Sequence, residues 1–370
     1  MKWVRTFNLN LRGMKRKFIL VVAVLTGLLG WQCSRNTNMD TLPLKNTDLK
    51  NSLQASVDKV NSAIGEISQT SGYQLLSSQN GSGLKSGESY TDSITMSMLK
   101  GVYSYQPDTN PPSCMNCLYK MFSKTGTSDA FVVKLPQKLI FHPQFLHRYD
   151  QSNAGLVNNF TITASDYHYY YTNGNLYDYK LSAGFTVDSS NIGSLYIHTH
   201  MNNTSGLDFS SKYSFENGYY ITASGKSGDT IQNTISLTSD TGTLFSETLT
   251  YTGGGNRFRL GRADYSLTIG NMEIRKLASV DSIQVYLNGT LQQKAAVRFI
   301  DSTDSTSTDH SVCSSRDIRI TFDDGTTTNL STLISPSVTI LNTVIGSMRN
   351  MYFATDIMDY IAYNIYMNRM

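Results

Sequence analysis

His198 and His200 have the spacing that most directly suggests chemistry. In a β-strand, two residues that are two positions apart project from the same face of the sheet, so both imidazoles can bind one metal ion, and imidazole suits zinc. Four other histidines could supply a third ligand through folding: His142, His147, His168 and His310. The pair is therefore a candidate metal site, and with it a metal-dependent hydrolase is one hypothesis. We favour the plainer interpretation, in which two histidines pack at a strand surface, because no His-Glu-x-x-His or equivalent motif is present.

Cys114 and Cys117 have the spacing of half a redox or zinc site. They lie just after two prolines, not at a strand-to-helix turn, and no second pair follows, so a thioredoxin-like protein or a zinc ribbon is disfavoured. In an oxidising compartment the alternative is a disulfide, within the pair or from one of its members to Cys313.

Tyrosines crowd the segment 167–179. If Asn173 and Gly174 form a two-residue turn, Tyr170 faces Tyr177 and His168 faces Tyr179, and rings cover both sides of one hairpin. Rings on an exposed face could stack on sugars or on a partner protein. We favour the alternative, in which they form structural cross-strand aromatic pairs. The candidate ligand-binding tyrosines are Tyr167, Tyr169, Tyr170, Tyr171, Tyr177 and Tyr179.

A region of short strands, 101–334, must position these side chains. Alternating apolar residues or β-branched runs predict strands at 102–105, 130–135, 159–164, 180–187, 194–198 and 266–269. Asn-Gly or Asp-Gly pairs at 173–174, 217–218, 288–289 and 324–325 tolerate the positive φ angles of type I′ hairpin turns. Parallel neighbours would need long helical crossovers, which this pattern lacks. We therefore predict a mainly β fold with a large antiparallel β-meander.

Helical patterns flank this region on both sides. Apolar residues that recur every three or four positions predict an amphipathic helix within 47–76: Leu49, Leu53, Val57, Val60, Ile64 and Ile67. Residues 77–100 then read as a linker. After Ser335 and Pro336, a cap and a first-turn proline, apolar stripes predict one or two helices in 335–370 that pack on the sheet. The later stripe is Ile357, Ile361, Ile365 and Met367.

The formal charge of the chain is dominated by its beginning. Without the six Lys and Arg residues of the first 17 positions, 25 basic residues stand against 28 acidic ones, and the net charge changes from +3 to −3. The rest of the chain therefore lacks the basic footprint of a nucleic-acid-binding protein. Only 16% of the residues are charged, which is typical of an exported β protein.

The first 33 residues have the pattern of a targeting signal. Lys15, Arg16 and Lys17 precede an apolar run from Phe18 to Trp31, and Cys33 follows. The run is shorter than the roughly 20 apolar residues that span a bilayer, which favours a cleaved signal over an anchor helix. This order resembles the signal peptides of bacterial lipoproteins. The resemblance covers only this segment and implies that 1–32 is removed, that Cys33 is lipidated and that 33–46 is a tether.

These observations favour a lipid-anchored protein of the cell envelope with a binding or structural role. The resemblance implies an outer-membrane lipoprotein that faces the periplasm or the cell surface and contacts the membrane through Cys33. The ligand would be a glycan, a lipid or a protein, and we expect no cofactor and no catalysis. A second hypothesis is a periplasmic carrier that holds an apolar ligand on a half-barrel, and the third is the metal-dependent hydrolase.

Overall fold

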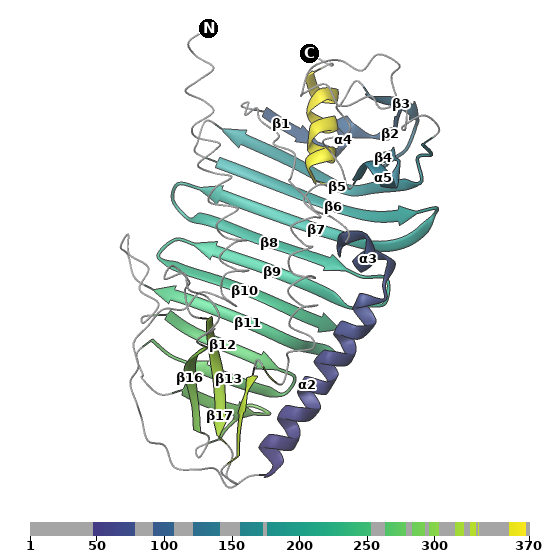
Figure 1. Ribbon diagram of the computed structural model, residues 1–370. Coiled ribbons are helices and arrows are strands. Elements are labelled where there is room, and N and C mark those ends of the chain that lie inside the picture. The colour runs from purple at the N-terminus through teal and green to yellow at the C-terminus, as the bar shows by residue number, and fades with distance from the viewer. Residues whose placement is uncertain are drawn as a thin grey trace, which may run out of the picture. The chain divides into compact units, whose positions relative to one another are not determined.

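The computed structural model describes residues 47–77, 92–106, 121–140, 156–172, 176–252, 263–278, 283–292, 296–302, 315–321, 326–330, 332 and 355–367 (Figure 1). The chain divides into two compact units. Of the described residues, unit 1 contains 69–218 and 355–367, and unit 2 contains 47–68 and 219–332. The region predicted as one β domain, 101–334, is therefore shared between two units.

Unit 1 is built on one sheet whose strands run in the order β8-β7-β6-β5-β4-β2-β3, with β1 also paired to β5. The four long strands are β5 (Phe160–Thr172), β6 (Leu176–Val187), β7 (Ser190–Asn202) and β8 (Gly206–Ser214). The short ones are β1 (Asp92–Thr95), β2 (Gly101–Tyr105), β3 (Phe122–Gly126) and β4 (Phe131–Leu135). From β5 to β8 the predicted antiparallel meander is confirmed.

One pair of strands departs from that prediction. β2 and β4 are parallel, and β3, which follows β2 in the chain, pairs with β2 on its other side. The connection between these parallel strands thus includes a strand, which corrects the prediction that parallel neighbours require helical crossovers. β1 and the short helix α4 (Met96–Leu99) also lie within 77–100, where the sequence predicted only a linker. The remaining short helices of unit 1 are α3 (Ser71–Ser77) and α5 (Gln137–Ile140).

Unit 2 contains seven strands that pair antiparallel in chain order. They are β9 (Tyr220–Ser227), β10 (Thr230–Ser239), β11 (Gly242–Thr252), β12 (Ala263–Ile269), β13 (Met272–Lys276), β14 (Ile283–Leu287) and β15 (Thr290–Leu291). A second sheet follows, formed by β16 (Ala296–Ser302), β17 (Ser315–Thr321) and β18 (Thr327–Asn329).

Helix α2 (Thr47–Ser68) packs against β11, β12 and β13 of unit 2 (Figure 1). Its six predicted apolar residues are all at most 2% exposed, which confirms the amphipathic pattern. The helix ends at Ser68, whose hydroxyl donates to the carbonyl oxygen of Gly65 at 2.7 Å. A new helix, α3, begins at Ser71, so the segment 47–76 contains two helices where one was predicted. Because the stripe of α2 covers the sheet, burial of these side chains stabilises unit 2.

The two faces of the long strands in unit 1 differ sharply in polarity. Residues on one face of β5 to β8 are buried, among them Phe160, Ile162, Leu181, Ile197 and Phe209. Their alternate neighbours on the other face are polar and only partly buried. A β-bulge at Ser165 keeps this alternation in step, because Ala164 pairs with Ala183 and Asp166 pairs with Ser182. We call the two sides the aromatic face and the polar face.

Turn residues explain several of the hairpins. Asn288 and Gly289 have φ angles of +51° and +76° and close the β14–β15 hairpin, as predicted. The equivalent turn between β6 and β7 uses Asp188 and Ser189, at +47° and +68°, which the sequence analysis did not select. At the predicted turn 217–218 only Gly218 has a positive φ, +87°, and its backbone N–H donates to the carbonyl of Phe215, so this pair does not form a type I′ turn. The predicted turns at 173–174 and 324–325 lie outside the described residues.

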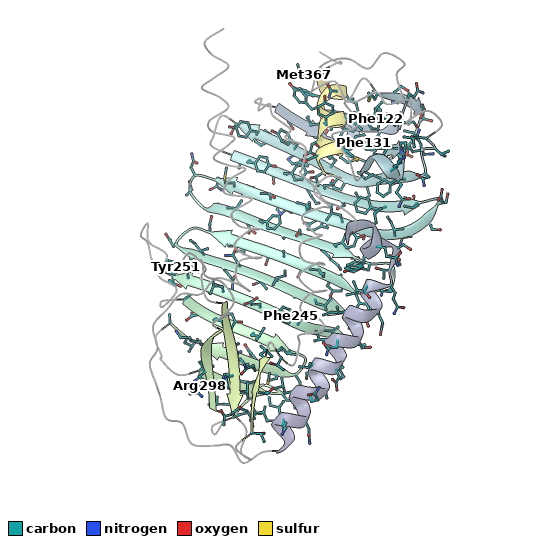
Figure 2. The ribbon with its side chains drawn as sticks, in the orientation of Figure 1. Phe122, Phe131, Phe245, Tyr251, Arg298 and Met367 are labelled. Atoms are coloured by element: carbon teal, nitrogen blue, oxygen red, sulfur yellow. The ribbon has the colours of Figure 1, made fainter. Side chains whose placement is uncertain are left out.

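The C-terminal helix spans residues 355–367 and belongs to unit 1. Ile357 and Ile361 are buried as predicted, whereas Met367, labelled in Figure 2, is 43% exposed. The preceding stripe, from Val338 to Tyr352, lies outside the described residues. Among the helices that the structure describes, none has the length and apolar character needed to cross a membrane.

Candidate functional site

The register of the β5–β6 hairpin decides where the tyrosines lie. Thr172 pairs with Leu176, so three residues separate the strands where the sequence analysis assumed two. Tyr171 consequently faces Tyr177, and Tyr169 faces Tyr179, which corrects the predicted pairs by one position. Because a one-residue shift moves every side chain of one strand to the other face, the consequence is large. All the candidate tyrosines except Tyr170 lie on the aromatic face.

These rings pack against one another, as the structural alternative predicted. Tyr167 and Tyr179 meet edge to face with centroids 6.0 Å apart, and Tyr169 and Tyr177 do the same at 6.0 Å. Phe131 of β4, labelled in Figure 2, continues the cluster to the other side of Tyr167. Tyr167, Tyr171 and Tyr179 are buried, at 2%, 8% and 5% exposed. They therefore serve as core residues and do not offer a surface for stacking on sugars.

The C-terminal helix covers this cluster and bonds to it. One carboxylate oxygen of Asp359, Oδ1, accepts hydrogen bonds from the hydroxyls of Tyr167 at 2.9 Å and Tyr179 at 3.0 Å. This contact confirms that a C-terminal helix packs on the sheet. It also gives two buried phenols the acceptor that each needs.

Tyr167 and Tyr179 make the stability of unit 1 sensitive to alkali. Burial, followed by the negative charge of Asp359, raises the pKa of both phenols well above the ordinary value of about 10. In the unfolded chain they ionise near pH 10, so the stabilisation from the neutral phenols is complete below that pH. It is lost as the pH rises further. We expect the free energy of unfolding to fall above pH ~10, by at most about 1.4 kcal/mol per pH unit for each phenol.

Denaturant titrations at several pH values between 7 and 11.5 measure this loss. The double variant Tyr167→Phe, Tyr179→Phe is the control, since it lacks both ionisable groups and should show a shallower decline. Parallel declines in the parent and the double variant would contradict the prediction.

The polar face of unit 1 gathers a different set of side chains. Strand pairing places Tyr170, Asp178, His200 and Asp208 in one row across β5 to β8. The next row holds His168, Lys180, His198 and Ser210, and the third holds Asp166, Ser182, Tyr196 and Lys212. We call these twelve residues the polar patch. The alternation of β-strands, together with the bulge at Ser165, brings them to one face.

Asp178 lies at the centre of the histidines. Its Oδ2 is 3.3 Å from His168 Nε2, and its Oδ1 is 3.3 Å from His198 Nε2 and 3.6 Å from His200 Nδ1. The Nε2 of His200 also lies 3.3 Å from the Nδ2 of Asn202. Between 31% and 38% of each of these four side chains is exposed, so the cluster is partly accessible to solvent, although Asp178 Oδ1 itself is buried.

Lys180 and Asp166 form an ion pair beside this cluster, with Nζ 2.6 Å from Oδ2. The hydrogen bond to Asp166, and then its charge, raises the pKa of Lys180 above its ordinary value. The polar patch thus contains carboxylates, ammonium groups and imidazoles side by side. Both donors and acceptors of hydrogen bonds are therefore present.

His198 and His200 share one face, as their spacing predicted, and folding brings in His168 as a third imidazole. The three rings surround a carboxylate, however, and do not converge on a common point. In the part of the chain that the structure describes, no group of three His, Cys, Asp or Glu side chains is arranged to hold a metal ion. His142, His147 and His310 lie outside that part, as do Cys33, Cys114, Cys117 and Cys313.

Comparison with known proteins adds no relative. No protein family model, curated protein or solved structure matches this chain. The interpretation of the polar patch thus depends on its own geometry. Sequence reasoning missed Asp178, Lys180 and Tyr196, because none of them belongs to a motif. For Tyr196 the signal is the alternation along 196–200, which puts it on the same face as His198 and His200. Asp178 and Lys180 lie on another strand, so only the register brings them to the histidines.

Proposed function

We propose that this protein is a lipid-anchored component of the bacterial cell envelope that binds a ligand through the polar patch of unit 1. The anchor is inferred from the order of basic residues, apolar run and Cys33. The observation that carries the binding role is the cluster of three imidazoles around Asp178 on a partly exposed sheet face. Within the described residues, the aromatic face already packs against the C-terminal helix, so we assign the partner to the polar patch.

The geometry supports this role better than the two rival hypotheses. A carrier would need an apolar cavity beneath the C-terminal helix, but Tyr167, Tyr179 and Asp359 meet there through hydrogen bonds. A metal-dependent hydrolase would need ligands that converge on one point. His168, His198 and His200 surround the carboxylate of Asp178, and within the described residues no group of three such side chains is arranged to hold a metal ion. Binding without catalysis requires neither feature.

Replacement of Cys33 by alanine tests the anchor. If Cys33 is the lipidated residue, the variant should lose incorporation of labelled palmitate completely and leave the membrane fraction or retain its signal segment. The parent and the variant Cys313→Ala, which keeps Cys33, should both remain labelled. Labelling of Cys33→Ala at the parental level would overturn the lipoprotein assignment.

A further inference from the structure

We infer that the ligand of the polar patch is a neutral glycan, a chain of uncharged sugars that lies across β5, β6 and β7. This inference rests on the proposed function, because it names the class of ligand for the same surface. It is drawn from the balance of charge in the patch, the imidazoles that surround Asp178 and the position of two tyrosines.

The charges of the patch favour a neutral ligand. Asp166, Asp178 and Asp208 alternate with Lys180 and Lys212 within three rows of the sheet. An acidic ligand would meet the carboxylates, and a cationic ligand would meet the ammonium groups, so either would encounter like charge. A polyhydroxylated neutral molecule can instead donate to the carboxylates and accept from the lysines. The mixture of groups suits hydroxyls better than ions.

The imidazoles around Asp178 add hydrogen-bonding groups for such a ligand. Asp178 contacts the Nε2 atoms of both His168 and His198, at 3.3 Å in each case. These are short contacts without hydrogen-bond geometry, since Asp178 Oδ1 accepts no hydrogen bond within the described residues. A neutral imidazole has one donor and one acceptor nitrogen, so each ring can donate to or accept from a ligand hydroxyl.

Two tyrosines lie at opposite ends of a diagonal across the part of the polar patch formed by β5, β6 and β7. Tyr170 on β5, Lys180 on β6 and Tyr196 on β7 lie on one diagonal of the pairing grid, because each step moves one strand across and one row along. With strands about 4.8 Å apart and a rise of about 3.3 Å per residue, the two tyrosines are roughly 16 Å apart. Both are partly exposed, and tyrosine combines an apolar ring with a polar tip. The rings can stack on sugars at both ends of the diagonal, with the imidazoles between them.

Binding of purified full-length protein in detergent to polysaccharides tests the inference. The probes are soluble neutral β-glucan and mannan, with polygalacturonate as the acidic comparison, and affinity is measured by calorimetry at pH 7. We expect a neutral polysaccharide to bind. Tyr196→Ala and Tyr170→Ala should each weaken its affinity roughly tenfold, the effect of about 1.4 kcal/mol, whereas Tyr196→Phe should keep most of it.

Tyr286→Ala is the matched control. Tyr286 is another partly exposed strand tyrosine, it lies in unit 2, and its ring is covered by the guanidinium of Arg275 at 4.7 Å. Its loss should leave affinity unchanged. Circular dichroism of every variant should match that of the parent, so that weaker binding reports on the surface and not on folding.

The remaining outcomes distinguish an error in the class of ligand from an error in the proposed binding role. Binding of polygalacturonate alone, weakened by Lys180→Ala, would overturn the neutral glycan but keep the polar patch as a binding surface. Binding of neither class, or equal binding by the parent and both alanine variants, would overturn the glycan inference. Palmitate labelling at Cys33 reports on the envelope anchor independently of all these results.

Discussion

Replacement of Asp359 by alanine should lower the free energy of unfolding by about 2–6 kcal/mol, because two buried phenols lose their acceptor at once. Each buried group left without a hydrogen bond costs about 1–3 kcal/mol. The hydroxyls of Tyr167 and Tyr179 both donate to Asp359 Oδ1, and both rings are at most 5% exposed. Denaturant unfolding followed by fluorescence or circular dichroism measures the loss.

Asp359→Asn is the conservative control. Its side-chain carbonyl can accept both hydrogen bonds without a charge, so it should lose less than the alanine variant does. In the triple variant Asp359→Ala, Tyr167→Phe, Tyr179→Phe, the stranded hydroxyls are removed and part of the stability should return. An alanine variant within about 0.5 kcal/mol of the parent would show that the helix is held mainly by its apolar residues.

Gly193→Ala should destabilise unit 1 by a similar amount, about 2–6 kcal/mol, since two costs combine. Gly193 has a φ angle of +140°, which a residue with a Cβ rarely adopts. An added Cβ would also lie 2.6 Å from the carbonyl oxygen of Ser214 and 2.6 Å from the hydroxyl of Tyr213. That hydroxyl donates to the carbonyl of Ile192 at 3.2 Å, so its movement would break a buried hydrogen bond.

Gly184 on the neighbouring strand offers a matched comparison. A Cβ there would meet nothing within 4 Å, and its backbone has no positive φ. Gly184→Ala should therefore stay within about 1 kcal/mol of the parent. Thermal and denaturant unfolding of the two variants, measured side by side, tests whether Gly193→Ala is the more destabilising substitution. Equal stabilities would mean that the sheet relaxes around Gly193 at little cost.

Local patterns in the sequence predicted the elements of the fold well. The stripe from Leu49 to Ile67 is regular because one face of α2 packs on an apolar sheet. Such periodicity can be recognised in the sequence without knowing which strands the helix will contact. Six predicted strands were also found, as was the type I′ turn at Asn288 and Gly289. The parallel pairing of β2 with β4 was not foreseeable, because strand order depends on contacts between distant segments.

The candidate site was harder to predict because it depends on register. The two-residue turn assumed at Asn173 placed His168 opposite Tyr179, and that error of one position mixed the imidazoles with the aromatic rings. The actual pairing with Lys180, together with the bulge at Ser165, separates them onto two faces. Neither the loop length nor a bulge has a strong sequence signal, so Asp178 could not be placed among the histidines beforehand.

The hydrogen bond from Tyr167 to Asp359 spans 192 positions of the chain, and this separation has a consequence for biosynthesis. Strands β5 and β6 are complete long before the ribosome makes the helix that covers them, and the residues of β9 to β18 are made in between. Until that helix arrives, the tyrosine cluster of the nascent chain is uncovered and prone to aggregate. Unit 1 therefore completes its folding only after residues 355–367 are made.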